Sequence, residues 1–266
     1  MGVHMETKEI LKKSIDEADL VLIGIGEEFF PSIDEFEEEY KRLIFDKRIF
    51  GLQLESLYKE IMLKKWLENH VDTKLEKAYS SIVNICKNKN FFIVSLGVDD
   101  YIYKFDLQNV VTPCGGRRQF QRKKAGETEL LDIELTQKLE KEIYQAFEIC
   151  DFEKLVSFDE MHKEEKLAYN NIFSEEYDEN GYLEYWNRYL KWVQGTVNRK
   201  ICVLELGVSL RIPSVIRFPF EKIVFYNNKA SFYRVNGHLY QMTAELKEKG
   251  VSIPENAVTF LGNLFV

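Results

Sequence analysis

The sequence predicts an α/β fold, built on a doubly wound parallel sheet with a small and mostly helical insertion. Short, continuous apolar runs recur along the chain, and most of them are closed by glycine. Such runs are typical of strands that are buried on both faces of a parallel sheet. Between the runs, apolar residues recur with the period of an amphipathic helix. This alternation of the two patterns predicts a Rossmann-like architecture with helices on both faces of the sheet.

The expected strands are the apolar runs themselves. They are Leu20–Ile25, Phe91–Leu96, Asn109–Thr112, Ile201–Leu206 and Lys222–Tyr226. Because the carboxyl ends of parallel strands share one edge of a sheet, we expect the residues that close four of these strands to meet there. These residues are Gly24, Gly97, Gly207 and Asn227.

The expected helices follow from the helical spacing of apolar residues. They are Thr7–Ala18, Gln53–Asn69, Thr73–Lys89, Glu127–Phe152, Tyr182–Val197 and Leu239–Lys249. We expect one domain over residues 5–266 with a helical segment at 27–89, in which 32–48 is charged and less regular. Residues 115–180 lack a clear alternation of strands and helices, so they are the expected insertion.

Composition narrows the classes of function. The 266 residues carry 36 Lys and Arg against 44 Asp and Glu, a formal net charge of −8, which argues against a nucleic-acid partner. No apolar stretch approaches the length of a membrane span, so we expect no membrane partner. The four cysteines lack the spacing of metal ligands, and we expect reduced thiols in a cytoplasmic protein.

Glycine-containing turns are the candidate binding elements. Folds of this class bind ligands beyond the carboxyl ends of the strands, where backbone amides can hold phosphate. Three turns fit this place: Gly24-Ile25-Gly26, Gly97-Val98-Asp99 and Gly207-Val208-Ser209. Glycine lets the backbone approach a ligand closely because it has no Cβ. The alternative is that these are ordinary turns between strand and helix.

Taken in order, these turns resemble the sirtuin family of NAD-dependent protein deacylases. The segment Ala18–Gly26 resembles the sirtuin opening strand with its Gly-Ala-Gly turn. Residues Ser95–Asp99 fall where sirtuins carry Thr-Gln-Asn-Ile-Asp, and Cys114-Gly115 falls where they carry His-Gly. Leu206–Leu210 is similar to the Gly-Thr-Ser-Leu motif, and Val224–Asn227 is similar to the late strand that ends in Ile-Asn.

The resemblance covers most of the chain and is strongest over Trp186–Asn228, which is similar to a bacterial branch with members linked to ADP-ribosylation. It is weakest over residues 27–89. It implies that NAD or ADP-ribose is the ligand. The cofactor-binding residues that it implies are Gly24, Ile25, Gly26, Gly97, Val98, Asp99, Gly207, Ser209 and Asn227.

The catalytic positions depart from the family pattern. Sirtuins use the His as general base, and the Asn positions the ribose and water, but here these positions are Cys114 and Gly97. A thiol replaces imidazole poorly because its usual pKa is about two units higher. The candidate catalytic residues are therefore Cys114 and Asp99, the latter standing where the sirtuin Asp contacts nicotinamide. Alternatively, Asp99 caps the helix that follows it.

Two further departures concern charge and metal. Glu27 and Glu28 follow Gly26 and would repel a bound diphosphate, or else simply cap a helix. The insertion at 115–180 stands in place of the sirtuin zinc module. Of the zinc ligands in that module, only two have a counterpart here, Asp159 and His162. Because a structural zinc site needs four ligands, we expect no zinc.

One basic cluster stands out in the acidic chain: Arg117-Arg118 and Arg122-Lys123-Lys124. It is predicted either to pair with phosphates of a nucleotide or of an ADP-ribosylated partner, or to be the solvated face of a hairpin.

Three functions remain open at this point. The first is a catalytically impaired protein that binds NAD, ADP-ribose or a protein partner, which could be acylated or ADP-ribosylated. The second is an active NAD-consuming deacylase or ADP-ribosyltransferase with non-standard catalytic residues. The third is an interaction subunit whose nucleotide cleft is closed by its own side chains.

Overall fold

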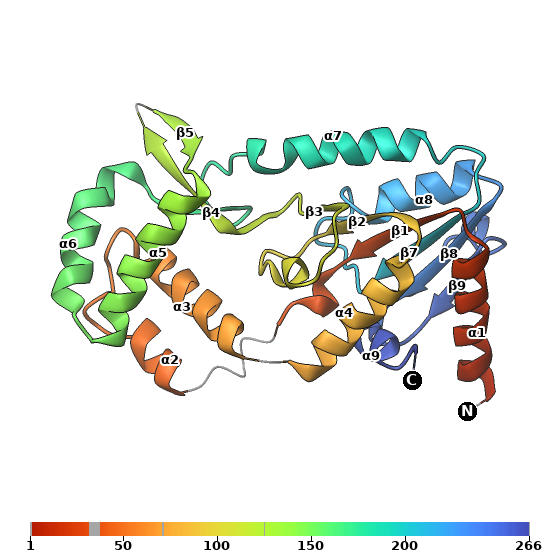
Figure 1. The fold of residues 1–266 in the computed structure, drawn as a ribbon, viewed down its shortest axis with the longest axis horizontal. Helices are drawn as coiled ribbons and strands as arrows, with labels where there is room; N and C mark the ends of the chain where they lie inside the picture. Colours follow the sequence, from red (N-terminus) through yellow and green to blue (C-terminus); the bar gives the residue numbers. More distant parts are fainter. Residues whose placement is uncertain (1, 32–37, 71, 125, 266) are drawn as a thin grey trace.

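The computed structural model describes residues 2–31, 38–70, 72–124 and 126–265. Its centre is a six-stranded, fully parallel sheet in the order β3-β2-β1-β7-β8-β9 (Figure 1). The strand order reverses between β1 and β7, which makes this pair the topological switch point. The strands are β1 (Leu20–Ile25), β2 (Asn90–Ser95), β3 (Val110–Val111), β7 (Ile201–Leu206), β8 (Ala230–Val235) and β9 (Gly250–Ile253).

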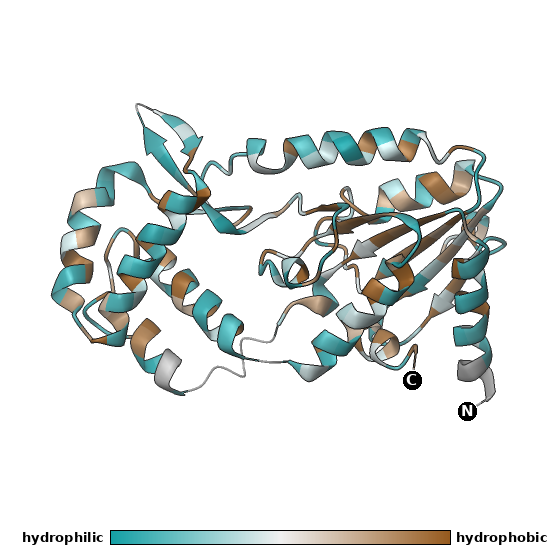
Figure 2. Cartoon of the chain, in the orientation of Figure 1, coloured by the Kyte–Doolittle hydropathy of each residue, from teal (hydrophilic) through white to brown (hydrophobic). Residues whose placement is uncertain are grey.

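Helices cover both faces of this sheet. One face packs against α1 (Gly2–Glu17), α4 (Thr73–Cys86) and α9 (Ala257–Gly262), and the other against α7 (Asn180–Gln194) and α8 (Arg217–Tyr226) (Figure 1). The side chains of β1 alternate between the two resulting cores, with Ile23 in the first and Leu22 in the second. Figure 2 shows the hydrophobic strands between helices whose outer faces are hydrophilic. The predicted doubly wound fold is confirmed.

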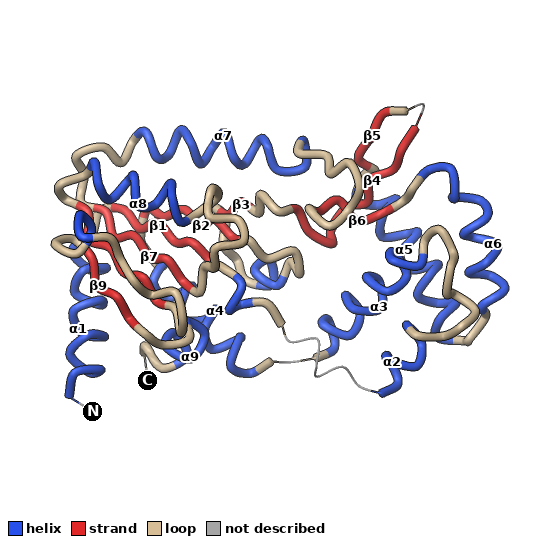
Figure 3. Tube along the Cα trace, turned by 180° about the vertical axis from the view of Figure 1, so that it is seen from behind, coloured by secondary structure: helices blue, strands red, loops and turns tan. Residues whose placement is uncertain are grey.

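A smaller module lies beyond one end of the sheet, as the view from behind shows (Figure 3). Its elements have a separate core, in which Tyr58, Phe120, Phe147 and Tyr169 are fully buried. They are α2 (Glu38–Ile44), α3 (Glu55–Asn69), β4 (Gly115–Lys124), β5 (Glu127–Leu130), α5 (Ile133–Glu148), α6 (Phe152–His162) and β6 (Ala168–Asn171). The predicted insertion at 115–180 contains the helices α5 and α6, but it also contains β5, β4 and β6, which form an antiparallel sheet that was not predicted. The described residues also form the short 3-10 helices η1 (Glu27–Phe29), η3 (Tyr101–Lys104), η4 (Lys163–Glu165) and η5 (Ala244–Leu246).

Several predicted elements differ from the structure. The predicted helix over Glu127–Phe152 begins instead as the strand β5, and α5 starts only after Asp132, whose carboxylate accepts the Leu135 amide at 2.7 Å. The predicted helix over Leu239–Lys249 is reduced to η5, and residues 32–37 of the expected irregular stretch lie outside the described residues.

The predicted strand Lys222–Tyr226 is wrong, because this segment is the second half of α8. Its β-branched and aromatic residues favour a strand locally, yet Phe220 and Val224 are buried against the sheet at helical spacing. Pro219 fits because it lies in the first turn, where amides have no partner within the helix. Tertiary packing therefore overrides the local preference.

The sequence analysis missed two strands of the parallel sheet, β8 and β9, as well as β4, β5 and β6 of the smaller sheet. In β8, a buried charge interrupts the apolar pattern. Arg234 of β8 is adjacent to Glu205 of β7, and its guanidinium donates to both Glu205 oxygens at 2.8 and 2.9 Å. Arg217 and Glu221 of α8 complete the group, at 2.9 Å from Glu205 and 2.6 Å from Arg234 respectively. Pairing of this kind makes a charge tolerable in the centre of a sheet. No helix among the described residues has the length and apolarity that crossing a bilayer requires.

We predict that Arg234→Met lowers the free energy of unfolding by about 3 kcal/mol, because Glu205 keeps its buried charge and loses its principal partner. Urea unfolding followed by circular dichroism measures the change. Arg199→Met, at an exposed position, is the matched control and should change stability by no more than about 0.5 kcal/mol. Equal stabilities of the two variants would contradict this account of β8.

Candidate functional site

The loops that follow β1, β2 and β7 meet at the carboxyl edge of the sheet. The Gly26 amide donates to the Leu206 carbonyl at 2.8 Å, and the Leu96 amide donates to the Ile25 carbonyl at 2.9 Å. A Cβ on Gly26 would lie 2.4 Å from the Cα atom of Val208, so only glycine allows the β1 and β7 loops to approach this closely. The structure thus places Gly26, and the loops that carry Gly97 and Gly207, where a Rossmann-like fold binds its ligand.

Two of the predicted cofactor-binding residues lie elsewhere. Gly24 is inside β1, where a Cβ would collide with Ile216 and Phe220 beneath α8, so its missing side chain serves packing. Asn227 ends α8 and donates to the carbonyls of Thr196 and Arg199 at 3.1 and 3.0 Å, before β7 begins. The prediction that Asn227 joins the glycine edge is therefore wrong, and the error follows from taking α8 for a strand.

Asn236 occupies the place that was expected for Asn227, directly after β8 at the carboxyl edge. Its side-chain amide donates to the Val208 carbonyl at 3.1 Å, and its oxygen accepts the amides of His238 and Leu239 at 2.9 and 2.7 Å. It therefore shapes the β8 loop next to the β7 loop. Sequence reasoning missed it because the strand before it was missed.

Glu27 bridges the β1 and β7 loops. Its carboxylate accepts the Ser209 amide at 2.8 Å and the Ser209 hydroxyl at 2.5 Å. Ser209 was a predicted cofactor-binding residue, and in this structure its donors are directed to a carboxylate of the same chain. Glu27 therefore occupies a position that favours an anion.

Glu28 makes the corresponding contacts on the other side. Its carboxylate oxygens accept the Gly237 amide at 2.8 Å and the Ala257 amide at 2.6 Å, the latter at the start of α9. Gly207, with φ of +64°, packs against the Glu28 side chain, and its carbonyl accepts the Glu28 amide at 3.2 Å. Together, the carboxylates of Glu27 and Glu28 accept hydrogen bonds from backbone amides of three separate segments at the edge.

Cys114 follows β3 and is buried, in one apolar core with Val98 and Val208. Burial, and to a lesser extent the negative charge of Glu27, raises the pKa of the Cys114 thiol to about 12. Arg117 does not oppose this, because its guanidinium is directed to the Val98 carbonyl at 3.3 Å and to Glu60 at 3.3 Å. At neutral pH, Cys114 is a neutral thiol and has little capacity to act as a base.

Two carboxylates follow β2. Asp99 accepts the amide of Tyr101, the first residue of η3, at 2.7 Å, although the N-cap residue of η3 is Asp100 and not Asp99 as the structural alternative expected. Burial raises the pKa of Asp99. Asp100, with φ of +60°, accepts the Arg117 amide, and burial raises its pKa to about 7. Sequence reasoning did not single out Asp100. The sequence signal that could have identified Asp100 is the pair of adjacent aspartates in the loop after a buried strand.

The remaining polar candidates have structural partners. Asp159 accepts the amides of Leu54 and Gln53 at 2.8 and 3.2 Å, while His162 lies 2.9 Å from Glu165. The part of the chain that the structure describes contains no group of three or more His, Cys, Asp or Glu residues arranged to hold a metal. Asp159 therefore connects α6 to the start of α3.

Comparison with known proteins gives a fold and a distant relative. No protein-family model matches the chain. A curated protein ADP-ribosyltransferase of Staphylococcus aureus (strain Mu50) is 20% identical over 294 aligned positions, which cover 98% of this chain and 89% of that protein.

Solved sirtuin structures share the fold. A Sir2 mutant with a p53 peptide and NAD has a TM-score of 0.54 at 9% identity and covers 97% of both chains. Sir2Tm bound to a propionylated peptide has a TM-score of 0.52 at 10% identity, over 95% of this chain and 94% of that one. The chain therefore has the sirtuin fold, which confirms the resemblance at the level of architecture.

We predict that iodoacetamide alkylates Cys150 much faster than Cys114 in the folded protein at pH 7.5. Cys150 is exposed, whereas Cys114 is buried with a raised pKa, and only a thiolate reacts rapidly. Peptide mass spectrometry after timed quenching measures both rates. In denaturant the two rates should converge, and comparable rates in the folded state would contradict the described environment of Cys114.

Proposed function

We propose that this sirtuin-fold protein binds NAD or ADP-ribose at the carboxyl edge of its sheet and releases nicotinamide no faster than background. The observation that carries the proposal is the pair Gly97 and Cys114. Gly97 has no side chain to orient a ribose or a water, and Cys114 is a buried neutral thiol beside Glu27. Positioned acid–base groups contribute roughly 10²–10⁴-fold in rate, and their loss predicts a protein that binds but does not turn over.

Ligand binding is supported by the fold and by the edge. Sirtuin structures with NAD and with peptides share the architecture, and the loops after β1, β2 and β7 converge as such a ligand requires. A peptide segment, acylated or ADP-ribosylated, is the protein partner that the same resemblance favours. These residues support binding of the nucleotide by backbone amides of the edge loops. The Tyr101 amide holds the Asp99 carboxyl in place by a hydrogen bond.

One observation favours a second candidate, an interaction subunit with a closed cleft. The amides of Ser209, Gly237 and Ala257 already hold the Glu27 and Glu28 carboxylates. A diphosphate that used the same amides would have to displace both side chains and would meet their negative charge. In this reading, the edge serves the stability of the fold and takes no nucleotide.

The name of the Staphylococcus aureus relative favours a third candidate, an active ADP-ribosyltransferase with non-standard residues. Asp99 or Asp100 would then replace the missing base, since burial raises the pKa of both carboxyls. Release of nicotinamide from NAD separates this candidate from the other two.

We predict background nicotinamide release by the wild-type protein and a gain of about 100-fold in the Gly97→Asn, Cys114→His double variant, which restores the family residues. Chromatographic detection of nicotinamide measures the rate, and a Gly97→Ala, Cys114→Ala variant is the matched control. A Cβ at residue 97 would lie 3.2 Å from Asp99, so a side chain fits after a small shift. Strong activity of the wild type that disappears in Asp99→Ala would overturn the proposal.

We predict that Glu27→Gln increases the affinity for ADP-ribose about tenfold, because it removes a charge next to the diphosphate that costs on the order of 1 kcal/mol. Glutamine keeps an oxygen that can accept the Ser209 amide. Isothermal calorimetry compares the wild type, Glu27→Gln and the exposed control Glu148→Gln, which should behave as wild type. If ADP-ribose binds to none of them, the closed-cleft candidate is correct.

A further inference from the structure

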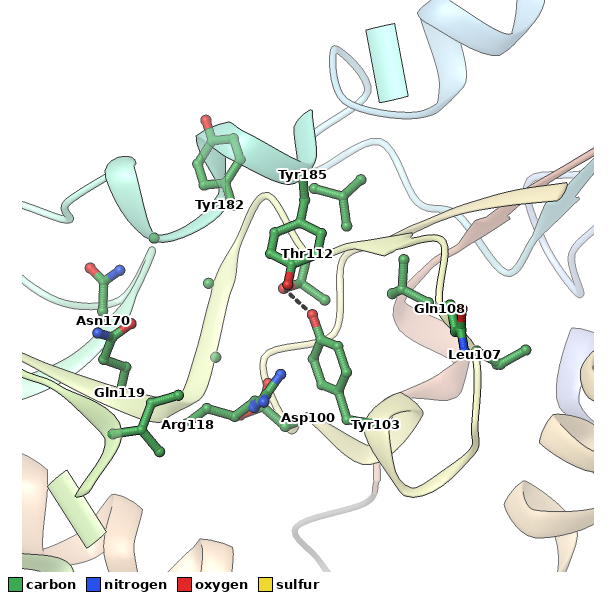
Figure 4. A pocket seen from close by; sticks show the side chains of 16 residues that line it. Asp100, Tyr103, Leu107, Gln108, Thr112, Arg118, Gln119, Asn170, Tyr182 and Tyr185 are labelled. Atoms are coloured by element: carbon green, nitrogen blue, oxygen red, sulfur yellow. Dashed lines mark hydrogen bonds between the residues drawn. The ribbon is translucent and has the colours of Figure 1, made fainter. Parts of the chain in front are cut away.

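A cavity of about 360 Å³ lies between the sheet and the smaller module, apart from the glycine edge. It is bounded by the outer strand β3, by η3, by the first residues of β4 and by the start of α7 (Figure 4). Neither Glu27, Gly97, Cys114 nor Ser209 lines it. The residues that matter here are Asp100, Tyr103, Gln108, Thr112, Arg118 and Tyr185.

Arg118 supplies the cavity with a cation. Three other members of its basic cluster have acidic partners: Arg117 pairs with Glu60 at 3.3 Å, Arg122 with Glu129 at 2.6 Å, and Lys123 with Glu176 at 2.5 Å. No ion pair of Arg118 is found within the described ranges, and its guanidinium instead lies 4.4 Å from the centre of the Tyr103 ring. Arg118 is an exposed residue, so the donors of its side chain are accessible to an anion.

Aromatic rings supply the cavity with flat, apolar surface. Tyr103 lies beside Arg118 and Asp100, while Tyr182 and Tyr185 reach the cavity from α7 on the opposite side (Figure 4). Exposed tyrosine and arginine planes are the surfaces on which nucleobases stack, with little dependence on the base. The Tyr103 hydroxyl lies 3.2 Å from the Thr112 hydroxyl, which leaves two polar groups beside the rings.

We propose that this cavity binds a nucleoside monophosphate, with its phosphate on Arg118 and its base against Tyr185. A dianionic phosphate matches the planar donors of arginine, and the volume is within the range of small-ligand pockets. Asp100 also lines the cavity, but its carboxyl accepts the Arg117 amide, and burial raises its pKa to about 7, so its negative charge is reduced at neutral pH. This site is separate from the one proposed for NAD or ADP-ribose and does not depend on it.

The test is isothermal calorimetry of the full chain with AMP, adenosine and inorganic phosphate. We expect AMP to bind, and adenosine and phosphate each to bind at least about tenfold more weakly, since each makes only half of the contacts. Arg118→Gln should weaken AMP binding about tenfold or more because the phosphate loses a charged hydrogen bond. Gln108→Trp, at an exposed residue of the cavity wall, should abolish binding by filling the space.

Arg122→Gln is the matched control, because Arg122 belongs to the same basic cluster but contacts Glu129, away from the cavity. It should retain the wild-type affinity within about twofold, and thermal unfolding should show that all variants are folded. The proposal is overturned if millimolar AMP produces no heat, or if Arg118→Gln and Arg122→Gln weaken binding equally. It is also overturned if Gln108→Trp binds AMP as tightly as the wild type, because AMP would then bind outside this cavity.

Discussion

The carboxylates of Glu27 and Glu28 hold together the carboxyl edge of the sheet. Parallel strands are joined by long connections, so nothing in the sheet itself fixes the loops at its edge relative to one another. Here Glu27 connects the β1 loop to Ser209, and Glu28 connects it to Gly237 and to the first residue of α9. The close contact of Gly26 with Val208 belongs to this arrangement, and the charge of Glu27 adds to burial, which is the larger cause, in raising the pKa of Cys114. Each function proposed for the edge therefore depends on whether the Glu27 and Glu28 side chains keep these hydrogen bonds or are displaced by a ligand.

Arg117 has a similar role between the two modules. Its guanidinium contacts Val98 after β2 and Glu60 on α3, its amide is accepted by Asp100, and its carbonyl accepts Lys64 at 2.7 Å. One residue of β4 thus fixes the loop after β2 against α3 of the smaller module. Since that loop borders both the glycine edge and the cavity that contains Arg118, the position of the smaller module determines the shape of both.

The sequence predicted the parts of the fold in which local pattern and tertiary environment agree. The strand β1 is apolar and buried throughout, and β2 and β7 contain the buried apolar runs Phe92–Val94 and Ile201–Leu204, so their pattern was sufficient. The strand β8 was missed because Arg234 interrupts it, and only its pairing with Glu205 explains a charge at that position. Likewise, Glu27 was expected to repel a diphosphate, but its contact with Ser209, 182 positions away, is not contained in any local pattern. Contacts of this kind arise from topology, and topology was correct only up to the misplaced strand at Lys222–Tyr226.

The position of β1 at the centre of the sheet has a consequence for how the chain reaches its native state. Leu20 pairs with Asn90 on one side and with Ile201 on the other, so the second partner of β1 is synthesised long after the first. Pairing of segments so distant along the chain is entropically slow, whereas α5 and α6 form from neighbouring residues. During translation, the apolar segment Leu20–Ile25 is therefore left with one open edge until β7 has emerged. We therefore expect the nascent protein to be most prone to association at this stage.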